Sequence, residues 1–392
     1  MHSRSKSSAL AKRMDGIAPF HVMRLLERAR QLEAEGREII HMEVGEPDFV
    51  TPQTITNAGI NALQQGKTHY TPATGIPELK QAIADYYLQR FKAQVNVGQV
   101  VVTPGASGAL QLVMDILVNP GDQVMMSDPG YPCNRHFVRL SEGVALNIPV
   151  NEGSAYQLTV EIVKQHWNDG VKAVMVASPS NPVGSCLDIQ QIEALLVFLK
   201  EKNAFLIMDE IYQGLTYDGQ SITALQLEFD NLFVINSFSK YFGMTGWRLG
   251  WMVLPEAFAQ AADRLAQNIF LAPQTMAQYA ALQAFSEETM DELERRREEF
   301  QQRRDFLLPA LEQLGFVAKA SPQGAFYLYM DCSGLTDDSF TFCQQLLEKA
   351  GVAITPGLDF GENKPEQHVR FAYTTSIERL KIGVKRIEDF LG

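Results

Sequence analysis

The chain has 392 residues, of which 46% are hydrophobic, and a formal net charge of −12. This length and composition predict a large core divided over more than one folding unit, because single cores stop growing at about 250–300 residues. The acidic charge argues against a general role on nucleic acids or anionic membranes and is compatible with a local basic pocket.

Neither the N-terminal residues nor the cysteines indicate export. The first residues, MHSRSKSSAL, are polar and basic and lack the apolar region of a secretory signal. No apolar run reaches the length of about 18 residues that a membrane span requires. The four cysteines are scattered without a CxxC pair, which favours reduced thiols over a disulfide framework or a zinc site. We therefore expect a cytoplasmic protein without a metal centre.

The predicted elements begin with a helix over residues 20–32, where apolar residues recur at helical spacing. Between residues 100 and 253, short apolar runs then alternate with helical stretches, a pattern typical of a largely parallel sheet covered by helices. The predicted strands are 100–103, 123–126, 173–176, 205–208, 233–235 and 249–253, and the predicted helices are 106–117, 189–200 and 255–267. Ligands of such sheets bind beyond the carboxyl ends of the strands, so the residues that follow each strand are site candidates.

The C-terminal part has a different pattern. Residues 287–314 contain ERRREEFQQRRDF, in which opposite charges three and four residues apart predict a long helix with a charged, solvated face. A strand is predicted at 325–330, followed by a shorter mixed α and β pattern. The fold class is therefore α/β, with a large domain at 46–286 and a smaller α+β domain built from both termini. That smaller domain would consist of an N-terminal arm and helix (1–45) and residues 287–392.

The strongest chemical candidate is Lys240, which closely follows the predicted strand 233–235. Ser237 and Ser239 precede it, and Arg248 lies eight residues beyond it. Hydroxyls and a guanidinium suit phosphate oxygens, and a lysine beside a bound phosphate ester can condense with an aldehyde on the same ligand. Without further context, a surface lysine in a loop is the simpler interpretation.

A second candidate is the turn TPGASG at residues 103–108, which joins a strand to a helix. Its small residues allow a ligand to approach the backbone, and the helix N-terminus favours an anion. Glycine-rich turns of this kind also occur for packing reasons alone.

Three further residues follow predicted strands. Asp209 directly follows strand 205–208, where a buried carboxylate needs a cation or several donors. It could be a metal ligand, a helix cap or the partner of a protonated ring nitrogen. Asn181 lies between two prolines and could donate to a ring oxygen, and Tyr131 lies between turn-forming residues and could stack on a planar ligand or cap the sheet.

Over almost its entire length the chain resembles the class I/II aminotransferases of the type I pyridoxal-phosphate (PLP) fold. The matching stretches run in order from VGEPDF (residues 44–49) to VRFAYT (369–374). The most specific is SFSKYFGMTGWRLGW (237–251), which is similar to the cofactor-lysine signature of that family.

The resemblance implies a role for each candidate. Lys240 would hold PLP as an internal aldimine and then move the proton between Cα and C4′. Asp209 would pair with the pyridinium nitrogen, Tyr212 and Asn181 would hydrogen-bond the ring oxygen O3′, and Tyr131 would stack on the ring. The residues implied to hold the phosphate are Gly105, Ala106, Ser107, Ser237, Ser239 and Arg248.

The resemblance also implies a substrate site and a partner. Arg370 would bind the substrate α-carboxylate through a bidentate fork, with Gly45 and Asn181 contacting the same region. Tyr70, in THYTPATG, matches a residue that reaches the phosphate of the neighbouring subunit, which implies a homodimer with shared sites.

The chain departs from some aspartate-specific relatives at Ser107, where those proteins carry a lysine that pairs with the distal carboxylate. Ile17, Phe20 and Phe326 match positions that line the substrate entrance in related enzymes, although such apolar residues also pack simply as core. The pocket wall is therefore expected to be partly apolar, which favours aromatic, alanine-like or sulfur-containing side chains.

The predicted function is a PLP-dependent aminotransferase that moves the amino group of an L-amino acid to a 2-oxo acid by a ping-pong mechanism. The resemblance makes 2-oxoglutarate the expected acceptor. One alternative is a carbon–sulfur β-elimination lyase, which uses the same lysine, aspartate and arginine. A second alternative is a non-catalytic PLP-binding sensor, but such regulators carry a preceding DNA-binding region, whereas the match here begins near Ile17.

Overall fold

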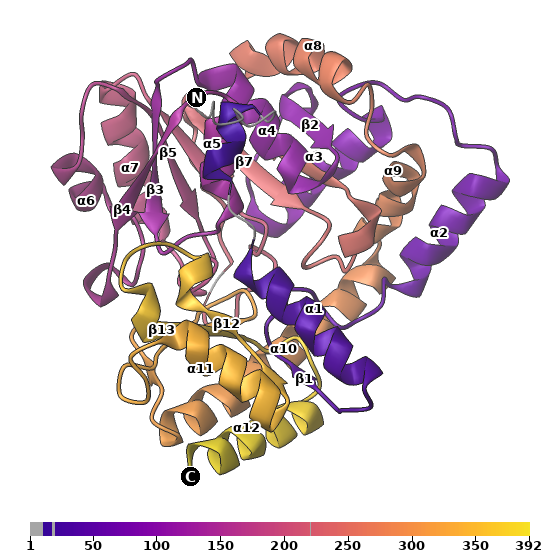
Figure 1. Ribbon diagram of the computed structural model, residues 1–392. Coiled ribbons are helices and arrows are strands. Elements are labelled where there is room, and N and C mark those ends of the chain that lie inside the picture. The colour runs from indigo at the N-terminus through magenta and orange to yellow at the C-terminus, as the bar shows by residue number, and fades with distance from the viewer. Residues whose placement is uncertain (1–10, 18–19, 220) are drawn as a thin grey trace, which may run out of the picture.

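A seven-stranded sheet forms the centre of the larger part of the computed structural model, which describes residues 11–17, 20–219 and 221–392 (Figure 1). The strand order is β2-β8-β7-β6-β5-β3-β4. Neighbouring strands are parallel, except that β8 runs antiparallel to both β2 and β7. The strands are β2 (Val100–Thr103), β3 (Gln123–Asp128), β4 (Val144–Pro149), β5 (Val171–Ala177), β6 (Phe205–Asp209), β7 (Leu232–Ser237) and β8 (Gly250–Val253).

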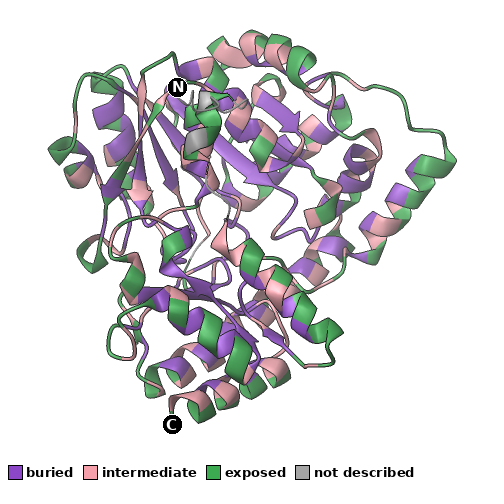
Figure 2. Cartoon of the chain, in the orientation of Figure 1, coloured by how far each residue is buried: buried purple, intermediate pink, exposed green. Residues whose placement is uncertain are grey.

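Both faces of this sheet are buried, which explains why its central strands read as short apolar runs (Figure 2). Along β6, Leu206 and Met208 belong to the hydrophobic cluster that includes residues of α7 (Ile189–Glu201). Ile207 belongs to the cluster that includes residues of α4 (Gly105–Leu117). Successive side chains of a strand point to opposite faces, so one apolar run supplies both cores.

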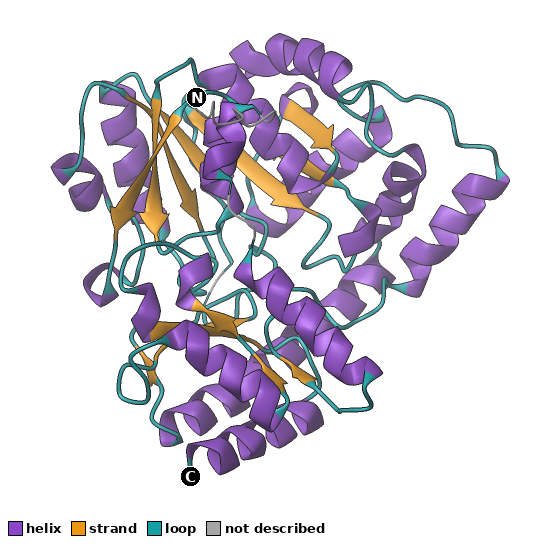
Figure 3. Cartoon of the chain, viewed as in Figure 1, coloured by secondary structure: helices purple, strands orange, loops and turns teal. Residues whose placement is uncertain are grey.

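Helices surround this sheet (Figure 3). Besides α4 and α7, the large part contains α2 (Gln53–Gln64), α3 (Pro77–Phe91), α5 (Cys133–Leu140), α6 (Val160–Gln165), α8 (Ala259–Ile269) and α9 (Thr275–Ala281). Among the described residues, no helix has the length and apolar character needed to cross a membrane.

The predicted α/β class with a mostly parallel sheet is confirmed, with differences in detail. Strand β4 was not predicted, although its sequence VALNIP is largely apolar; it lies at the sheet edge, and most of its residues are at least partly exposed. The helix predicted over 255–267 begins later, because a 3-10 turn (Glu256–Phe258) precedes α8.

The C-terminal segment builds a second, antiparallel sheet in the order β12-β13-β10-β9. Its elements are α10 (Glu287–Gln313), β9 (Val317–Ala318), β10 (Tyr327–Asp331), α11 (Ser339–Gln345), β12 (Thr355–Pro356), β13 (His368–Ala372) and α12 (Ile377–Leu391). From the other end of the chain, β1 (Ile40–His41) pairs in parallel with β11 (Val352–Ala353). The two ends of the chain therefore meet in this part of the molecule, whereas the domain boundaries at 46 and 286 stay predictions.

Helix α10 is charged, as predicted, but its charges are not all solvated. Arg303 is 1% exposed and donates to both carboxylate oxygens of Asp48, at 2.7 and 3.0 Å. It also donates to Glu299 at 2.5 Å, and its guanidinium lies over the ring of Phe49. A buried guanidinium needs such partners, so this arginine attaches α10 to the VGEPDF segment.

Helix α1 (His21–Ala34) packs through Leu25, Ala29 and Leu32, which lie on one helical face. A polar contact to α1 comes from His41. The Nδ1 atom of His41 lies 2.7 Å from Oε1 of Glu43, which is fully buried, and its Nε2 atom lies 3.1 Å from Oε1 of Glu33 on α1. The hydrogen bond to Glu43, together with the nearby carboxylate charges, raises the pKa of His41 to about 9.

This cluster predicts a pH-dependent contribution to stability. Because the pKa of His41 is higher in the folded state (about 9) than its ordinary value of 6.5, the contribution is complete below pH ~6.5 and is lost as the pH rises through ~9. We expect the melting temperature of the native protein to fall more over this interval than that of His41→Gln. His166→Gln, at an exposed position, serves as control. Parallel melting profiles for the native protein and His41→Gln would contradict the prediction.

Candidate active site

A cavity of about 270 Å³ lies at the carboxyl edge of the large sheet, between that edge, the start of α1 and the small sheet. Most of the predicted site residues line it. These are Gly45, Ala106, Ser107, Tyr131, Asn181, Asp209, Tyr212, Ser237, Ser239, Lys240, Arg248 and Arg370, together with Phe20. The structure therefore brings together residues that the sequence singled out by strand position or by resemblance, and the roles of these residues stay predictions.

Lys240 follows β7 by three residues and extends into the cavity, where its Nζ atom donates to the carbonyl oxygen of Gly45 at 2.8 Å. Desolvation lowers the pKa of Lys240 to about 8, a shift that Arg370 and Arg248 reinforce and Glu46 opposes. The amine therefore holds its proton less firmly than a surface lysine does, as a nucleophilic or proton-transferring amine must.

Asp209 is the last residue of β6 and is 4% exposed. Burial raises the pKa of its carboxyl to about 6, while the N–H of Ile211, which donates to Oδ1 at 3.2 Å, and the charge of Lys240 act in the opposite direction. The carboxylate thus lies in a desolvated position where a cationic group of a ligand would stabilise it.

An anion-binding arrangement surrounds the start of α4. The hydroxyl of Ser237 lies 3.0 Å from that of Ser239 and also accepts from the N–H of Ser239 at 3.0 Å. Arg248 donates from Nη1 to the hydroxyl of Ser239 at 3.4 Å and to the carbonyl of Thr245 at 3.0 Å. Two hydroxyls, a guanidinium and the free N–H groups of a helix N-terminus therefore converge.

Gly105 does not line the cavity but shapes it. Its φ of +71° suits glycine, and a β-carbon here would lie 2.7 Å from Nη2 of Arg248. The absence of a side chain allows the guanidinium to lie against the first turn of α4. The positive φ therefore favours glycine at this position, and Arg248 occupies the space that a side chain would take.

Arg370, on β13, is 5% exposed and is held on several sides. Its Nη1 donates to Oδ1 of Asn181 at 3.0 Å, and its Nη2 donates to the carbonyl of Glu43 at 2.6 Å. Its guanidinium carbon lies 4.3 Å from the ring centroid of Tyr327 and 4.8 Å from that of Phe360. The buried Nε has no partner among the described residues, so the fork retains donor capacity toward an anion.

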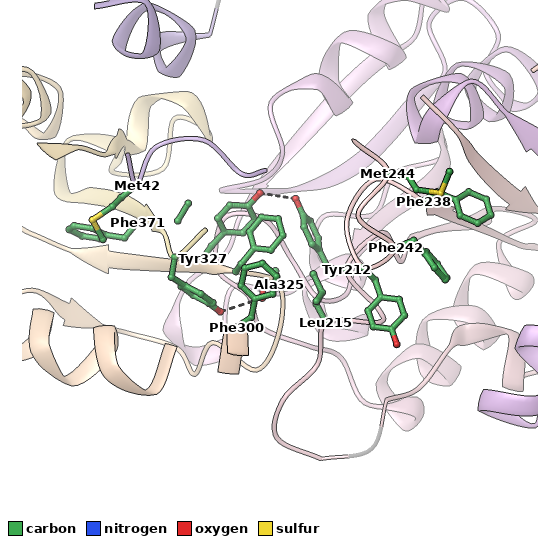
Figure 4. Packing of buried hydrophobic residues seen from close by; sticks show 14 of the residues in the cluster. Met42, Tyr212, Leu215, Phe238, Phe242, Met244, Phe300, Ala325, Tyr327 and Phe371 are labelled. Carbon is green, nitrogen blue, oxygen red and sulfur yellow. Dashed lines mark hydrogen bonds between the residues drawn. The ribbon is translucent and has the colours of Figure 1, made fainter. Parts of the chain in front are cut away.

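Tyr212 and Tyr327 face each other across the two sheets, with their hydroxyl oxygens 2.8 Å apart (Figure 4). Burial raises the pKa of both, so both are neutral hydroxyls. A β-carbon on Gly45 would lie 1.9 Å from the hydroxyl oxygen of Tyr327. The glycine of the VGEPDF segment is therefore required by the position of Tyr327.

Besides Gly105, three predicted residues lie outside the cavity wall. Phe326 is fully buried and packs against Tyr212 and Phe300, because adjacent residues of an extended chain point to opposite sides and Tyr327 takes the cavity side. Ile17 is half-buried and does not line the cavity, since its neighbour Gly16 lies against the side chain of Arg139 on α5.

Tyr70 is the third of these residues, and it does not reach the cavity of its own chain. It is 83% exposed, on a loop whose neighbours are anchored to α9. His69 accepts from the hydroxyl of Thr275 at 2.7 Å, and Gln278 donates to Thr71 at 2.9 Å. The loop is thus fixed while its aromatic residue faces outward.

Other wall residues were not found from the sequence. They include Val22, Met23, Glu43, Leu110, Tyr327, Thr355, Asp359 and Phe360. None belongs to a pattern with a chemical interpretation of its own, and most come from the terminal segments that fold over the sheet edge. Among the described residues, no group of three His, Cys, Asp or Glu side chains could hold a metal ion.

Comparison with known proteins agrees with this geometry. Residues 37–387 match the family model for aminotransferase class I and II. The chain is 36% identical to (5-formylfuran-3-yl)methyl phosphate transaminase of Methanocaldococcus jannaschii, over 97% of this chain and 99% of that protein. It is 34% identical to valine–pyruvate aminotransferase of Mycobacterium tuberculosis, over 96% and 97%. The crystal structure of an aminotransferase from M. tuberculosis superimposes with a TM-score of 0.94 at 34% identity, covering 98% of this chain and 99% of that one.

The sheet and the helices that cover it are those of a fold type I PLP enzyme. The chain belongs to the class I and II aminotransferase family, and it is a PLP-dependent transaminase. The resemblance noted in the sequence is therefore confirmed at the level of family and reaction.

The residues present fit the cofactor that the family implies. A lysine with a lowered pKa and a buried carboxylate line one cavity. The two serines, Arg248 and the start of α4 provide an anion site beside them, which Gly105 leaves open to the guanidinium. An aldehyde, a ring nitrogen and a phosphate thus each have a complementary partner.

The tyrosine pair yields a stability prediction. Because each hydroxyl is buried, removing one leaves the other without its partner, and we expect Tyr212→Phe and Tyr327→Phe each to lower the free energy of unfolding by about 1–2 kcal/mol. The double variant should lose about 1 kcal/mol less than the sum of the two. Urea unfolding measures the three variants, and strict additivity would show that the hydroxyls do not interact.

Proposed function

We propose that this protein moves the amino group of an L-amino acid with an apolar side chain to a 2-oxo acid, by a ping-pong mechanism with Lys240 as the catalytic base and acid. The observation that carries the proposal is that Lys240 and Arg370 line one cavity, where the charge of Arg370 helps to lower the pKa of Lys240. The expected acceptor, 2-oxoglutarate, rests on resemblance.

The cofactor, when bound, supplies an aldehyde that takes up the amino group and a ring that accepts the electrons released at Cα. Lys240 holds the cofactor and moves the proton at Cα of the substrate, which its lowered pKa favours. Asp209 keeps the ring nitrogen protonated by providing a desolvated anion beside it. Arg248, Ser237, Ser239 and the first turn of α4 bind the phosphate.

Four side chains orient the substrate and the ring. Arg370 binds the α-carboxylate, because its planar fork matches two oxygens and its Nε has no other partner among the described residues. The Oδ1 atom of Asn181 already accepts from Arg370, which leaves its amide N–H groups for the ring oxygen. Tyr212 provides a second hydroxyl for that oxygen, and Tyr131, at the cavity wall, stacks on the ring.

The wall suggests the donor class. Phe20, Val22, Met23, Leu110 and Phe360 give the cavity an apolar side. The cations of the described wall are Lys240, Arg248 and Arg370, and each already has a role in the proposal. A distal carboxylate therefore has no further cation from this chain's described wall, whereas an apolar side chain gains burial of about 25 cal/mol per Å². The similarity to an enzyme named for valine and pyruvate agrees with this choice.

A single-turnover screen tests the proposal. The cofactor-loaded protein is mixed with each L-amino acid, and the visible spectrum of the cofactor is followed. We expect conversion with apolar donors that a 2-oxo acid reverses, and no conversion in Lys240→Ala, which lacks the amine that moves the proton. Lys385→Ala, at an exposed position on α12, should match the native protein.

Two results would contradict the proposal. Release of ammonia, thiol and a 2-oxo acid without an added acceptor would indicate the β-elimination lyase. Normal turnover by Lys240→Ala would show that another group moves the proton.

We also propose a homodimer in which Tyr70 completes the partner's site. The anchored loop presents Tyr70 outward, and exposed apolar residues Ile60, Leu63 and Leu271 are available for an interface. A second copy related by two-fold symmetry would bury such a self-complementary surface.

Mixed dimers test this arrangement. Lys240→Ala and Tyr70→Ala chains are unfolded together and refolded, so that about half of the dimers contain one of each. If Tyr70 serves the partner's site, one of the two sites in each mixed dimer has both native residues, and about a quarter of native turnover should return at limiting cofactor. Separately refolded chains are the control. Failure to exceed the summed activity of those controls would place Tyr70 outside the partner's site.

A further inference from the structure

The first turn of α1 is capped by a residue from the other end of the chain. The residue at the cap position, Phe20, forms no side-chain hydrogen bond to the helix. Instead Asp359, in the turn Gly357–Asp359 after β12, accepts from the N–H of His21 at 2.7 Å and from the N–H of Val22 at 2.8 Å. The free N–H groups and partial positive charge of a helix N-terminus stabilise such a carboxylate.

Asp359 is itself firmly held. It is 3% exposed, and Arg135 of α5 donates to its carbonyl oxygen at 3.2 Å. Each of its two carboxylate oxygens accepts one N–H of the first helical turn, so two hydrogen bonds fix the position of the helix start. Because the cap is not part of the helix sequence, it determines where α1 begins relative to the small sheet.

The capped turn forms part of the cavity wall. Phe20, Val22 and Met23 line the cavity from the start of α1. Phe360, next to Asp359, lines it from the other side and packs on the guanidinium of Arg370 at 4.8 Å. One short turn therefore sets both the apolar wall and the flank of the arginine proposed to bind the α-carboxylate.

We propose that Asp359 is a positioning residue for donor selectivity, holding the start of α1 so that Phe20, Val22 and Met23 form the surface that receives an apolar side chain. This inference rests on the proposed aminotransferase function. A substrate bound through its α-carboxylate places its side chain against this wall only while α1 begins at the observed position. Alanine, whose side chain is one methyl group, makes little use of the wall and serves as the reference donor.

Asp359→Asn is the direct test, because it preserves size but presents an N–H₂ group to one of the two helix N–H donors and removes the charge. We expect kcat/KM for phenylalanine and valine to fall about tenfold more than kcat/KM for alanine, mainly through KM. Amide hydrogen exchange in residues 21–32 should accelerate about tenfold or more. Asp359→Ala should show the same pattern more strongly.

The matched control is Asp188→Ala, which removes the aspartate cap of α7, where Asp188 accepts from the N–H of Gln191 at 2.7 Å. It loses a cap of the same chemistry away from the cavity, so the donor ratio and the exchange of α1 should stay native. An equal loss for all donors in Asp359→Asn, or an unchanged donor ratio, would overturn the proposal. Absence of turnover in the native protein with every donor would instead refute the proposed function.

Discussion

The buried guanidinium of Arg370 is the contact on which the arrangement of the cavity depends, because it draws its partners from three separate segments. Asn181 follows a strand of the large sheet, Glu43 lies in the N-terminal segment, and Tyr327 and Phe360 belong to the C-terminal part. Leaving a buried charge without partners costs several kcal/mol. The two sheets and the N-terminal segment are therefore held together at the point where the substrate carboxylate is proposed to bind.

Burial acts in opposite directions on the two ionisable groups at the sheet edge. It lowers the pKa of Lys240 to about 8 and raises that of Asp209 to about 6, so each group moves toward its neutral form. A ligand that supplies the missing partners would offset the free-energy cost of this desolvation. In the proposed arrangement, PLP would present an aldehyde to the amine, a ring nitrogen to the carboxylate and a phosphate to Arg248, so that the binding free energy of one molecule would offset several desolvated contacts.

The sequence was most informative where function follows directly from strand position. Lys240 became a candidate because it follows an apolar run at the carboxyl edge, and the family resemblance of residues 237–251 then favoured it over a surface lysine. The orientation of Arg248 could not be predicted, since it precedes β8 and reaches the same edge because that strand is antiparallel, which an apolar run does not reveal. The choice between Phe326 and Tyr327 depended on which face each residue takes. The carboxylate of Asp359 accepts a hydrogen bond from the N–H of His21, which lies 338 residues away in the sequence. No local sequence pattern predicts such a contact.

The groups proposed for chemistry and for selectivity lie on different parts of the fold. The proton-transferring amine, the ring partner and the anion site are fixed at the edge of a sheet buried on both faces, where small displacements are costly. The wall that meets the substrate side chain comes instead from the start of α1 and the turn after β12. Substitutions there can change the donor without moving Lys240. Such a separation is compatible with the different substrates in the names of relatives at 36% and 34% identity, a furan phosphate aldehyde and valine.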